Sequence, residues 1–189
     1  MPRDAGLSVI FETHATSLDN EAGVASGWFD VSLSATGEEQ ARRLGARRRH
    51  DQFAAVFCSD LIRSFRTAEI AFGDRRLPIV RDGRLRECDY GGLTRCPTSE
   101  IEQRRALHVT TPFPDGESYQ QVVDRVSAWL DDVMQQFDTC TVLVIGHRAT
   151  FYALEHLLRP MALTEAVTST WTWQPGWTYR VAHPHPRVG

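Results

Sequence analysis

The sequence predicts a single α/β domain, a three-layer sandwich whose central, mostly parallel sheet is flanked by helices. Short apolar segments alternate with segments of helical periodicity along the chain, which is typical of a parallel sheet with helical crossovers. The segment 141–145 is continuously apolar, as expected of a strand buried on both faces. The chain of 189 residues is long enough for one domain with a sizeable core. We expect residues 1–182 to form this domain and residues 183–189 to form a tail.

The N-terminal half of the chain shows the alternation clearly. Residues 7–13 are apolar and form the first predicted strand. Thr36 and Glu39 have the spacing of a capping box, which predicts a helix running through the sequence GEEQARRLGARRR. The other expected elements here are a strand at 54–58, a helix at about 60–72 and a third strand at 77–80.

The C-terminal half begins irregularly and then resumes the alternation. Residues 81–116 contain several glycines and prolines, so we expect only one short helix there, near 98–107. Residues 117–137 carry apolar side chains at helical spacing and form the clearest predicted helix. The remaining expected elements are the strand at 141–145, a helix at 149–158 and an edge strand with its turn at 171–181.

Composition excludes several classes of protein. The net charge of −3 gives no general reason to bind nucleic acid or an anionic membrane. All 21 basic residues are arginine, so phosphate contacts must come from arginine, histidine, hydroxyl groups or backbone N–H groups. The four cysteines form no Cys-x-x-Cys pair, which argues against a zinc ribbon and suits a reducing cytosol. With no apolar run long enough to span a membrane, we expect a cytoplasmic location.

Two histidines follow predicted strands directly. His14 comes at the end of the first strand, and His147 follows the strand at 141–145. Ligands of open α/β sheets bind beyond the carboxyl ends of the strands, so both imidazoles could share one crevice. Arg63, near the start of a helix, adds a guanidinium group whose geometry matches phosphate oxygens. A neutral imidazole can attack phosphorus while a backbone carbonyl holds its second nitrogen, so these residues predict a phosphoryl site.

Five ordered motifs extend this prediction to nearly the whole chain. They read THATSLDN with GWFD and LSATGEEQA, then SDLIRSFRTA, LRECDYG, PDGESYQQVVDRV and IGHRA. In these motifs the chain resembles the histidine phosphatase superfamily, whose fold is the phosphoglycerate-mutase-like α/β sandwich. Five motifs in the family order are far more specific than any single histidine motif.

The resemblance implies a role for each matching residue. His14 would be the nucleophile that forms a transient phosphohistidine, while Arg63 and His147 would hold the non-bridging oxygens. Glu87 would protonate the leaving alkoxide and later activate water, with Asp89 as the alternative acid. The resemblance implies no metal and no other cofactor. Phosphoryl transfer of this kind depends mainly on positioning and on complementary charge.

The chain departs from the family pattern on both sides of its histidines. Thr13 stands where the family carries arginine, and Ala15 stands where it carries glycine. Arg148 follows the second histidine in place of a common glycine. We hypothesise that the Thr13 hydroxyl contacts phosphate and that Arg148 supplies part of the missing positive charge; an Arg148 that faces solvent is the alternative.

Three further residues complete the predicted phosphate-binding set. Asn20 could donate to a phosphate or ester oxygen, although an Asx turn would explain it equally. Gly27 lies in the GWFD motif. Glu117 would lie near the pocket entrance, or would serve only the opening of its helix, where Ser118 could be the cap.

The predicted activity is hydrolysis of a small phosphomonoester. The segment between Gly91 and Glu117 is short, so the phosphohistidine would be exposed to water, which favours a phosphatase over a mutase. A phosphoglycerate-type mutase and a catalytically weakened protein that binds phosphorylated metabolites are the alternatives, and Thr13 motivates the second. A degraded site would not need a nucleophile and an acid together.

The substrate is predicted only by class. We expect a small phosphorylated metabolite, either a sugar phosphate or a nucleoside monophosphate, and leave open whether the chain forms a homodimer. Neither nucleic acid nor a membrane is an expected partner. The aromatic side chains that could stack on a sugar or base are Trp28, Phe29, Tyr90, Trp171, Trp173 and Trp177. For the last three, packing in the core or at the sheet edge is the default interpretation.

Overall fold

A five-stranded sheet forms the centre of the computed structural model, which describes residues 6–182. The strand order is β3-β2-β4-β1-β5, with β5 antiparallel to β1 and every other pair parallel. This confirms the predicted mostly parallel α/β sheet; the expected tail at 183–189 lies outside the described residues. The strands are β1 (Gly6–Thr13), β2 (Ala55–Cys58), β3 (Ile79–Arg81), β4 (Thr141–Gly146) and β5 (Trp177–Ala182).

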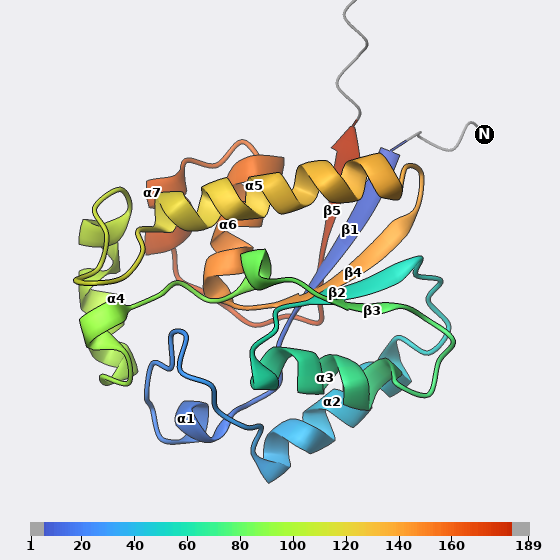
Figure 1. Cartoon of the computed structure of the whole chain (residues 1–189), viewed down its shortest axis with the longest axis horizontal. Coiled ribbons are helices and arrows are strands. Elements are labelled where there is room, and N and C mark those ends of the chain that lie inside the picture. Colours follow the sequence, from blue (N-terminus) through green and yellow to red (C-terminus); the bar gives the residue numbers. More distant parts are fainter. Residues whose placement is uncertain (1–5, 183–189) are drawn as a thin grey trace, which may run out of the picture.

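Helices cover both faces of the sheet and complete the three layers (Figure 1). One face carries α2 (Ala35–Arg47) and α3 (Ile62–Phe72). The other carries α5 (Tyr119–Gln136), α6 (Arg148–Leu158) and α7 (Leu163–Thr168). The shorter helices are α1 (Leu18–Glu21), α4 (Thr98–Arg104) and the 3-10 turns η1 (Gly83–Leu85), η2 (Gly91–Leu93) and η3 (Arg105–His108).

The alternation of side chains along β1 divides the core into two parts. Val9 and Phe11 join the larger cluster under α5 and α6, whereas Ile10 packs against the cluster under α3. Trp129 of α5 is fully buried, and its ring lies edge-on to Phe57 with centroids 5.5 Å apart. Since both faces are covered, the central strands need apolar residues at every position, which explains the continuous run in β4.

The N-cap residue predicted for α5 is confirmed, whereas the one predicted for α2 is not. Ser118 caps α5 as expected, because its hydroxyl accepts from the Gln121 N–H while the Gln121 side chain accepts from the Ser118 N–H. The predicted capping box at Thr36 is wrong. Ser34 is the cap of α2, and its hydroxyl accepts from the Gly37 N–H at 3.1 Å, which places Thr36 inside the first turn.

The predicted edge strand at 171–181 is shorter than expected. β5 begins only at Trp177, where pairing with β1 begins opposite Phe11. Residues 171–176 form an irregular segment before it, and Gly176 turns the chain at φ +87°. The short helix α7 was not predicted. Among residues 6–182, no helix has the length and apolarity needed to cross a membrane.

The register of the sheet determines where the functional residues meet. Thr13 of β1 lies opposite Gly146 of β4, and Cys58 of β2 lies opposite Ile145. These three parallel strands therefore end at the same edge, and the residues that follow them leave the sheet side by side.

Candidate active site

His14 and His147 lie next to each other at this edge. The His14 N–H donates to the Gly146 carbonyl at 2.9 Å, which continues the β1–β4 pairing by one residue. The two imidazole centroids are 4.9 Å apart, with the ring planes inclined at 56°. The parallel sheet thus brings together two histidines that are far apart in the sequence.

The His14 ring is held as a neutral imidazole. Its Nδ1 lies 2.7 Å from the Ala15 carbonyl oxygen, which can only accept, so Nδ1 carries the proton and Nε2 has a free lone pair. The Thr67 hydroxyl fixes this backbone by accepting from the Ala15 N–H and donating to the Arg63 carbonyl. Burial, with the nearby Arg63 charge, lowers the pKa of His14 from 6.5 to about 3. At neutral pH His14 therefore has the form that a nucleophile requires.

His147 is buried beneath it and is oriented by a serine. Its Nε2 lies 2.7 Å from the Ser59 hydroxyl, and Ser59 itself is anchored through its N–H to the Ser64 hydroxyl. Burial lowers the pKa of His147 well below its ordinary value, and Arg63 and His14 lower it further. The Nδ1 atom of His147 is buried and makes no hydrogen bond within the described part of the chain.

Ser59 belongs to this arrangement although it was absent from the predicted site. It directly follows β2, at the same sheet edge as the two histidines. Its position after a strand was the sequence signal that could have identified it.

Arg63 is buried and tied to the loop that precedes α2. Its Nη2 donates to the Gly27 carbonyl at 2.7 Å, and its Nη1 donates to the Phe29 carbonyl at 3.1 Å. Gly27 has φ +52°, and a Cβ there would lie 3.2 Å from a ring carbon of Tyr90. Gly27 therefore acts on the site through its carbonyl, which orients the arginine.

The Glu87 carboxylate faces the N-terminus of α6. Its Oε1 accepts from the N–H groups of Cys88 and Ala149, at 2.8 and 3.1 Å, and its Oε2 accepts from the N–H of Arg148 at 3.2 Å. Glu87 also lines both cavities described below. Asp89, the alternative acid, accepts from the Gly91 N–H and lines neither cavity.

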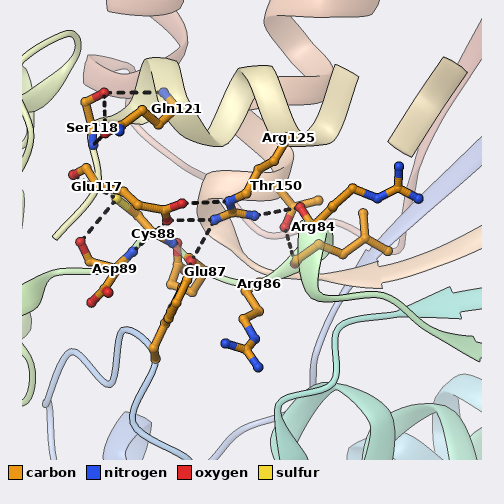
Figure 2. Close-up of polar contacts among 12 residues, drawn as sticks. Arg84, Arg86, Glu87, Cys88, Asp89, Glu117, Ser118, Gln121, Arg125 and Thr150 are labelled. Carbon is orange, nitrogen blue, oxygen red and sulfur yellow. Dashed lines mark hydrogen bonds and ion pairs between the residues drawn. The ribbon is translucent and has the colours of Figure 1, made fainter. Parts of the chain in front are cut away.

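Glu117 lies behind this carboxylate and outside both cavities. It forms a bidentate ion pair with Arg125, with both N–O distances 3.0 Å (Figure 2). Arg125 in turn donates to the carbonyls of Arg84 and Glu87, at 2.6 and 2.9 Å. The pair therefore braces the segment that carries Glu87. Arg125 was not among the predicted site residues although it lies in the motif PDGESYQQVVDRV, because helical spacing alone does not show which carboxylate an arginine will meet.

Arg148 lines both cavities with His14 and contacts a glutamate and a tryptophan. Its Nη1 pairs with Glu102 at 3.1 Å, and its guanidinium carbon lies 5.3 Å from the Trp171 ring centroid. Its Nε is buried, with no hydrogen-bond partner among the described residues. The guanidinium is thus held by a carboxylate and an aromatic ring, while 31% of the side chain remains exposed.

Thr13 and Asn20 both contribute to the cavity walls. Thr13 lines the larger cavity, beside His14. The Asn20 side-chain oxygen accepts from the Ser17 N–H as part of the α1 capping box, and Asn20 lines both cavities. The amide of Asn20 therefore already has a structural role, and its NH₂ group remains available to a ligand.

Two adjoining cavities converge on His14. The larger encloses about 690 Å³ and the smaller about 130 Å³. Arg63 lines only the smaller cavity, and His147 lines only the larger. The residues common to both walls are His14, Asn20, Glu87 and Arg148. A phosphoryl group at this junction would meet most of the residues predicted from the motifs.

Comparison with known proteins supports the resemblance seen in the motifs. The sequence model of the histidine phosphatase superfamily (branch 1) matches residues 9–170. The uncharacterized phosphatase PhoE of Bacillus subtilis is 34% identical over 128 residues, which are 68% of this chain and 65% of that protein. The probable phosphoglycerate mutase GpmB of Citrobacter koseri is 34% identical over 149 residues, 75% of this chain and 69% of the relative. The match thus spans about two thirds of each relative.

Solved structures share the fold. YhfR of Bacillus stearothermophilus superposes with a TM-score of 0.80 at 23% identity, covering 97% of this chain and 98% of that one. A putative α-ribazole-5′-P phosphatase from Escherichia coli superposes with a TM-score of 0.74 at 23% identity, covering 85% and 83%. At these identities the likeness concerns the fold.

Proposed function

Because the chain belongs to the histidine phosphatase superfamily (branch 1), we propose that it hydrolyses a small phosphomonoester without a metal, through a phosphohistidine on His14. One observation carries this proposal: Nδ1 of His14 is held by the Ala15 carbonyl, and His14 lines both cavities. The imidazole therefore presents Nε2 as its nucleophilic atom.

The first step transfers the phosphoryl group to His14. Nε2 attacks phosphorus, the bond from phosphorus to the ester oxygen breaks, and that oxygen leaves with the electron pair. The ring becomes cationic as the new bond forms, and the Nδ1–H bond to the Ala15 carbonyl stabilises this charge. A histidine that starts neutral can do this without first losing a proton.

Charge on the non-bridging oxygens needs donors on several sides. Arg63 has five N–H donors, of which two are occupied by the carbonyls of Gly27 and Phe29, so three remain for phosphate. When the Ser59 hydroxyl donates to Nε2 of His147, the ring proton lies on Nδ1, whose hydrogen-bonding capacity is unused. Preorganised donors of this kind stabilise the transition state without reorganisation.

Glu87 is the group best placed to handle the proton. Glu87 lies where the two cavities meet, so in its carboxylic acid form, with the proton on Oε2, it can give that proton to the leaving oxygen and become a carboxylate. In the second step it takes a proton from water, the water oxygen attacks phosphorus, and the bond to Nε2 of His14 breaks to release inorganic phosphate. The three backbone donors on its carboxylate, and the Arg125 contact to its carbonyl, limit its movement.

The arginine missing at Thr13 is replaced in part by Arg148. The unpaired Nε of Arg148 and its position on both cavity walls support this assignment. The Thr13 hydroxyl adds a neutral donor on the side of the larger cavity. This arrangement places a second guanidinium near the phosphoryl group in addition to Arg63, although the charge of Arg148 is shared with Glu102.

A mutase is the main alternative, and a protein that only binds phosphorylated metabolites is the other. The large cavity beside His14 favours hydrolysis, because once the alcohol half has left it gives water room to reach the phosphohistidine. A screen for phosphate release across metabolites, with His14→Ala as the blank, tests the proposal. His50→Ala, which changes an exposed histidine, is the matched control.

Each alternative has its own result in this experiment. Release of free phosphate by the wild type and by His50→Ala, but not by His14→Ala, supports the phosphatase. Isomerised product without phosphate indicates a mutase. Binding without turnover, and with no phosphoryl group on His14 by intact-protein mass spectrometry, indicates the weakened protein.

A further inference from the structure

The larger cavity continues beyond the catalytic residues. From His14 it passes Thr13 and reaches the space between α2 and the irregular segment 171–176. The walls of this extension are aromatic on one side and polar or basic on the other: Trp171, Trp173, Thr16, Gln40, Arg43 and Arg47. None of these residues is needed for the phosphoryl chemistry described above.

Trp173 presents an unpacked ring in this extension. It is 54% exposed and makes no ring contact with any described residue. Its neighbours differ, because Trp171 packs between Arg148 and Trp177, and Trp177 is 6% exposed in the core. An exposed tryptophan on a cavity wall offers a flat apolar surface on which a planar group can stack.

The segment that carries Trp173 is fixed in place by Arg48. This arginine donates to Glu12 and, at 3.2 Å, to the Pro175 carbonyl. Gly176 has φ +87°, a conformation that residues with a side chain rarely adopt, and a Cβ there would crowd the Arg48 guanidinium. The Arg48 contact to the Pro175 carbonyl therefore holds the segment that carries Trp173 against the rest of the domain.

The opposite wall offers hydrogen-bond donors. Arg47 uses Nη2 to contact both Glu12 oxygens at 3.0 Å, and its other guanidinium N–H groups have no partner within residues 6–182. The Gln40 oxygen is occupied by the N–H and hydroxyl of Thr16, which leaves its NH₂ group as a donor. A ring with carbonyl or ring-nitrogen acceptors on its edge matches these donors.

We propose that this extension binds the planar ring of the substrate's alcohol half, so that the preferred substrates are nucleoside monophosphates. The inference rests on the proposed function, since it places the phosphoryl group at His14. The ring stacks on Trp173 while acceptors on its edge face Arg47 and Gln40. A sugar phosphate, which carries no planar base, would leave this part of the cavity unused.

Substrates that share ribose and phosphate but differ in the presence of the planar base provide the test. The kcat/KM values of adenosine and uridine 5′-monophosphate are compared with that of ribose 5-phosphate, which shares their phosphoryl group and sugar. Stacking on an aromatic side chain contributes about 1–3 kcal/mol, so we expect at least one nucleotide to exceed ribose 5-phosphate by about fivefold or more. Trp173→Ala should remove most of that preference, mainly through KM, and Trp173→Phe should retain much of it.

The matched control is Leu107→Ala, which removes an exposed apolar side chain outside both cavities. It should leave all the kcat/KM values within about twofold. Equal kcat/KM for nucleotides and ribose 5-phosphate in the wild type would overturn the inference. So would a Trp173→Ala variant that loses activity equally toward both, because that result indicates a general structural effect.

A binding experiment separates this inference from the proposed function. Calorimetric titration of His14→Ala with the same three compounds does not depend on turnover. Tighter binding of a nucleotide than of ribose 5-phosphate, lost in His14→Ala combined with Trp173→Ala, supports the extension even if no phosphate is ever released. Equal binding of all three compounds contradicts the extension, while phosphate release from ribose 5-phosphate by the wild type would leave the proposed function standing.

Discussion

The Ser59 hydroxyl lies 2.7 Å from Nε2 of His147 and is hydrogen-bonded to it. Both side chains are buried, at 0% and 1% exposure. A serine hydroxyl can donate or accept, and when it donates to Nε2 the His147 ring carries its proton on Nδ1, the nitrogen that could then donate to a phosphoryl group.

The first prediction concerns this bond. Ser59→Ala should lower kcat by about tenfold, as loss of an orienting partner behind a functional histidine often does. Ser34→Ala is the matched control: it removes another buried serine, the cap of α2, and should cost about 1 kcal/mol of stability with kcat unchanged. Steady-state kinetics and urea unfolding of both variants check this. A Ser59→Ala enzyme with wild-type kcat would show that the tautomer is set in another way.

The second prediction compares the two arginines nearest the histidines. Arg63→Ala should lower kcat/KM by about 10²–10³, as loss of a preorganised charged donor does. Arg148→Ala should lower it by about tenfold or more if Arg148 replaces part of the missing charge at Thr13. The measurement is the kcat/KM ratio for each variant. A change below about twofold for Arg148→Ala would leave the replacement without support.

The third prediction concerns the brace behind Glu87. Arg125→Gln removes the pair with Glu117 and the contact to the Glu87 carbonyl, so kcat should fall by about tenfold while KM changes little. Arg84→Gln is the control, because Arg84 pairs with Asp82 and Asp132 and its side chain lies outside both cavities. Its kcat should stay within about twofold. A rise in KM with an unchanged kcat would argue that Arg125 does not position the acid.

The fourth prediction is a pH dependence of stability. His14 has a pKa of 6.5 when unfolded and about 3 in the folded protein, so between these values the unfolded chain binds more protons. The stability associated with the neutral imidazole is complete above about pH 6.5 and is lost as the pH falls toward 3. His14→Asn should reduce the slope of unfolding free energy against pH in this range by up to about 1.4 kcal/mol per pH unit.

Urea unfolding at several pH values between 7 and 4 measures this slope. His50→Asn, a change at an exposed histidine, is the control variant. Identical slopes for wild type and His14→Asn would mean that the His14 imidazole takes up a proton as readily in the folded protein as in the unfolded chain.

Much of the fold followed from local pattern. The alternation of apolar and helical segments predicted every strand of the sheet, and the period of the α5 sequence predicted its buried face, because burial imposes these repeats wherever an element packs. Thr36 was misassigned as a cap because two hydroxyl residues lie near the start of α2. The choice between them depends on the backbone conformation of Ser34, which the sequence does not reveal.

The site followed from the sequence only where a motif adjoins a strand end. His14 and His147 were paired from their positions after strands, and the register of β1 with β4 places them side by side. Glu117 was expected at the pocket entrance. In the structure it precedes α5 and forms an ion pair with Arg125 of that helix. Nothing in the spacing shows which of several arginines a carboxylate will meet.

The sequence by itself therefore determined the α/β class, the family and the residues available for phosphoryl chemistry, because hydrophobic periodicity and motif order are local properties of the chain. Only the tertiary structure decided how those residues are used: the tie from Ala15 to the His14 ring, the Ser59 bond to His147, and the different fates of Trp173 and Trp177. These depend on which surfaces meet when distant segments pack together, and packing is a property of the whole fold.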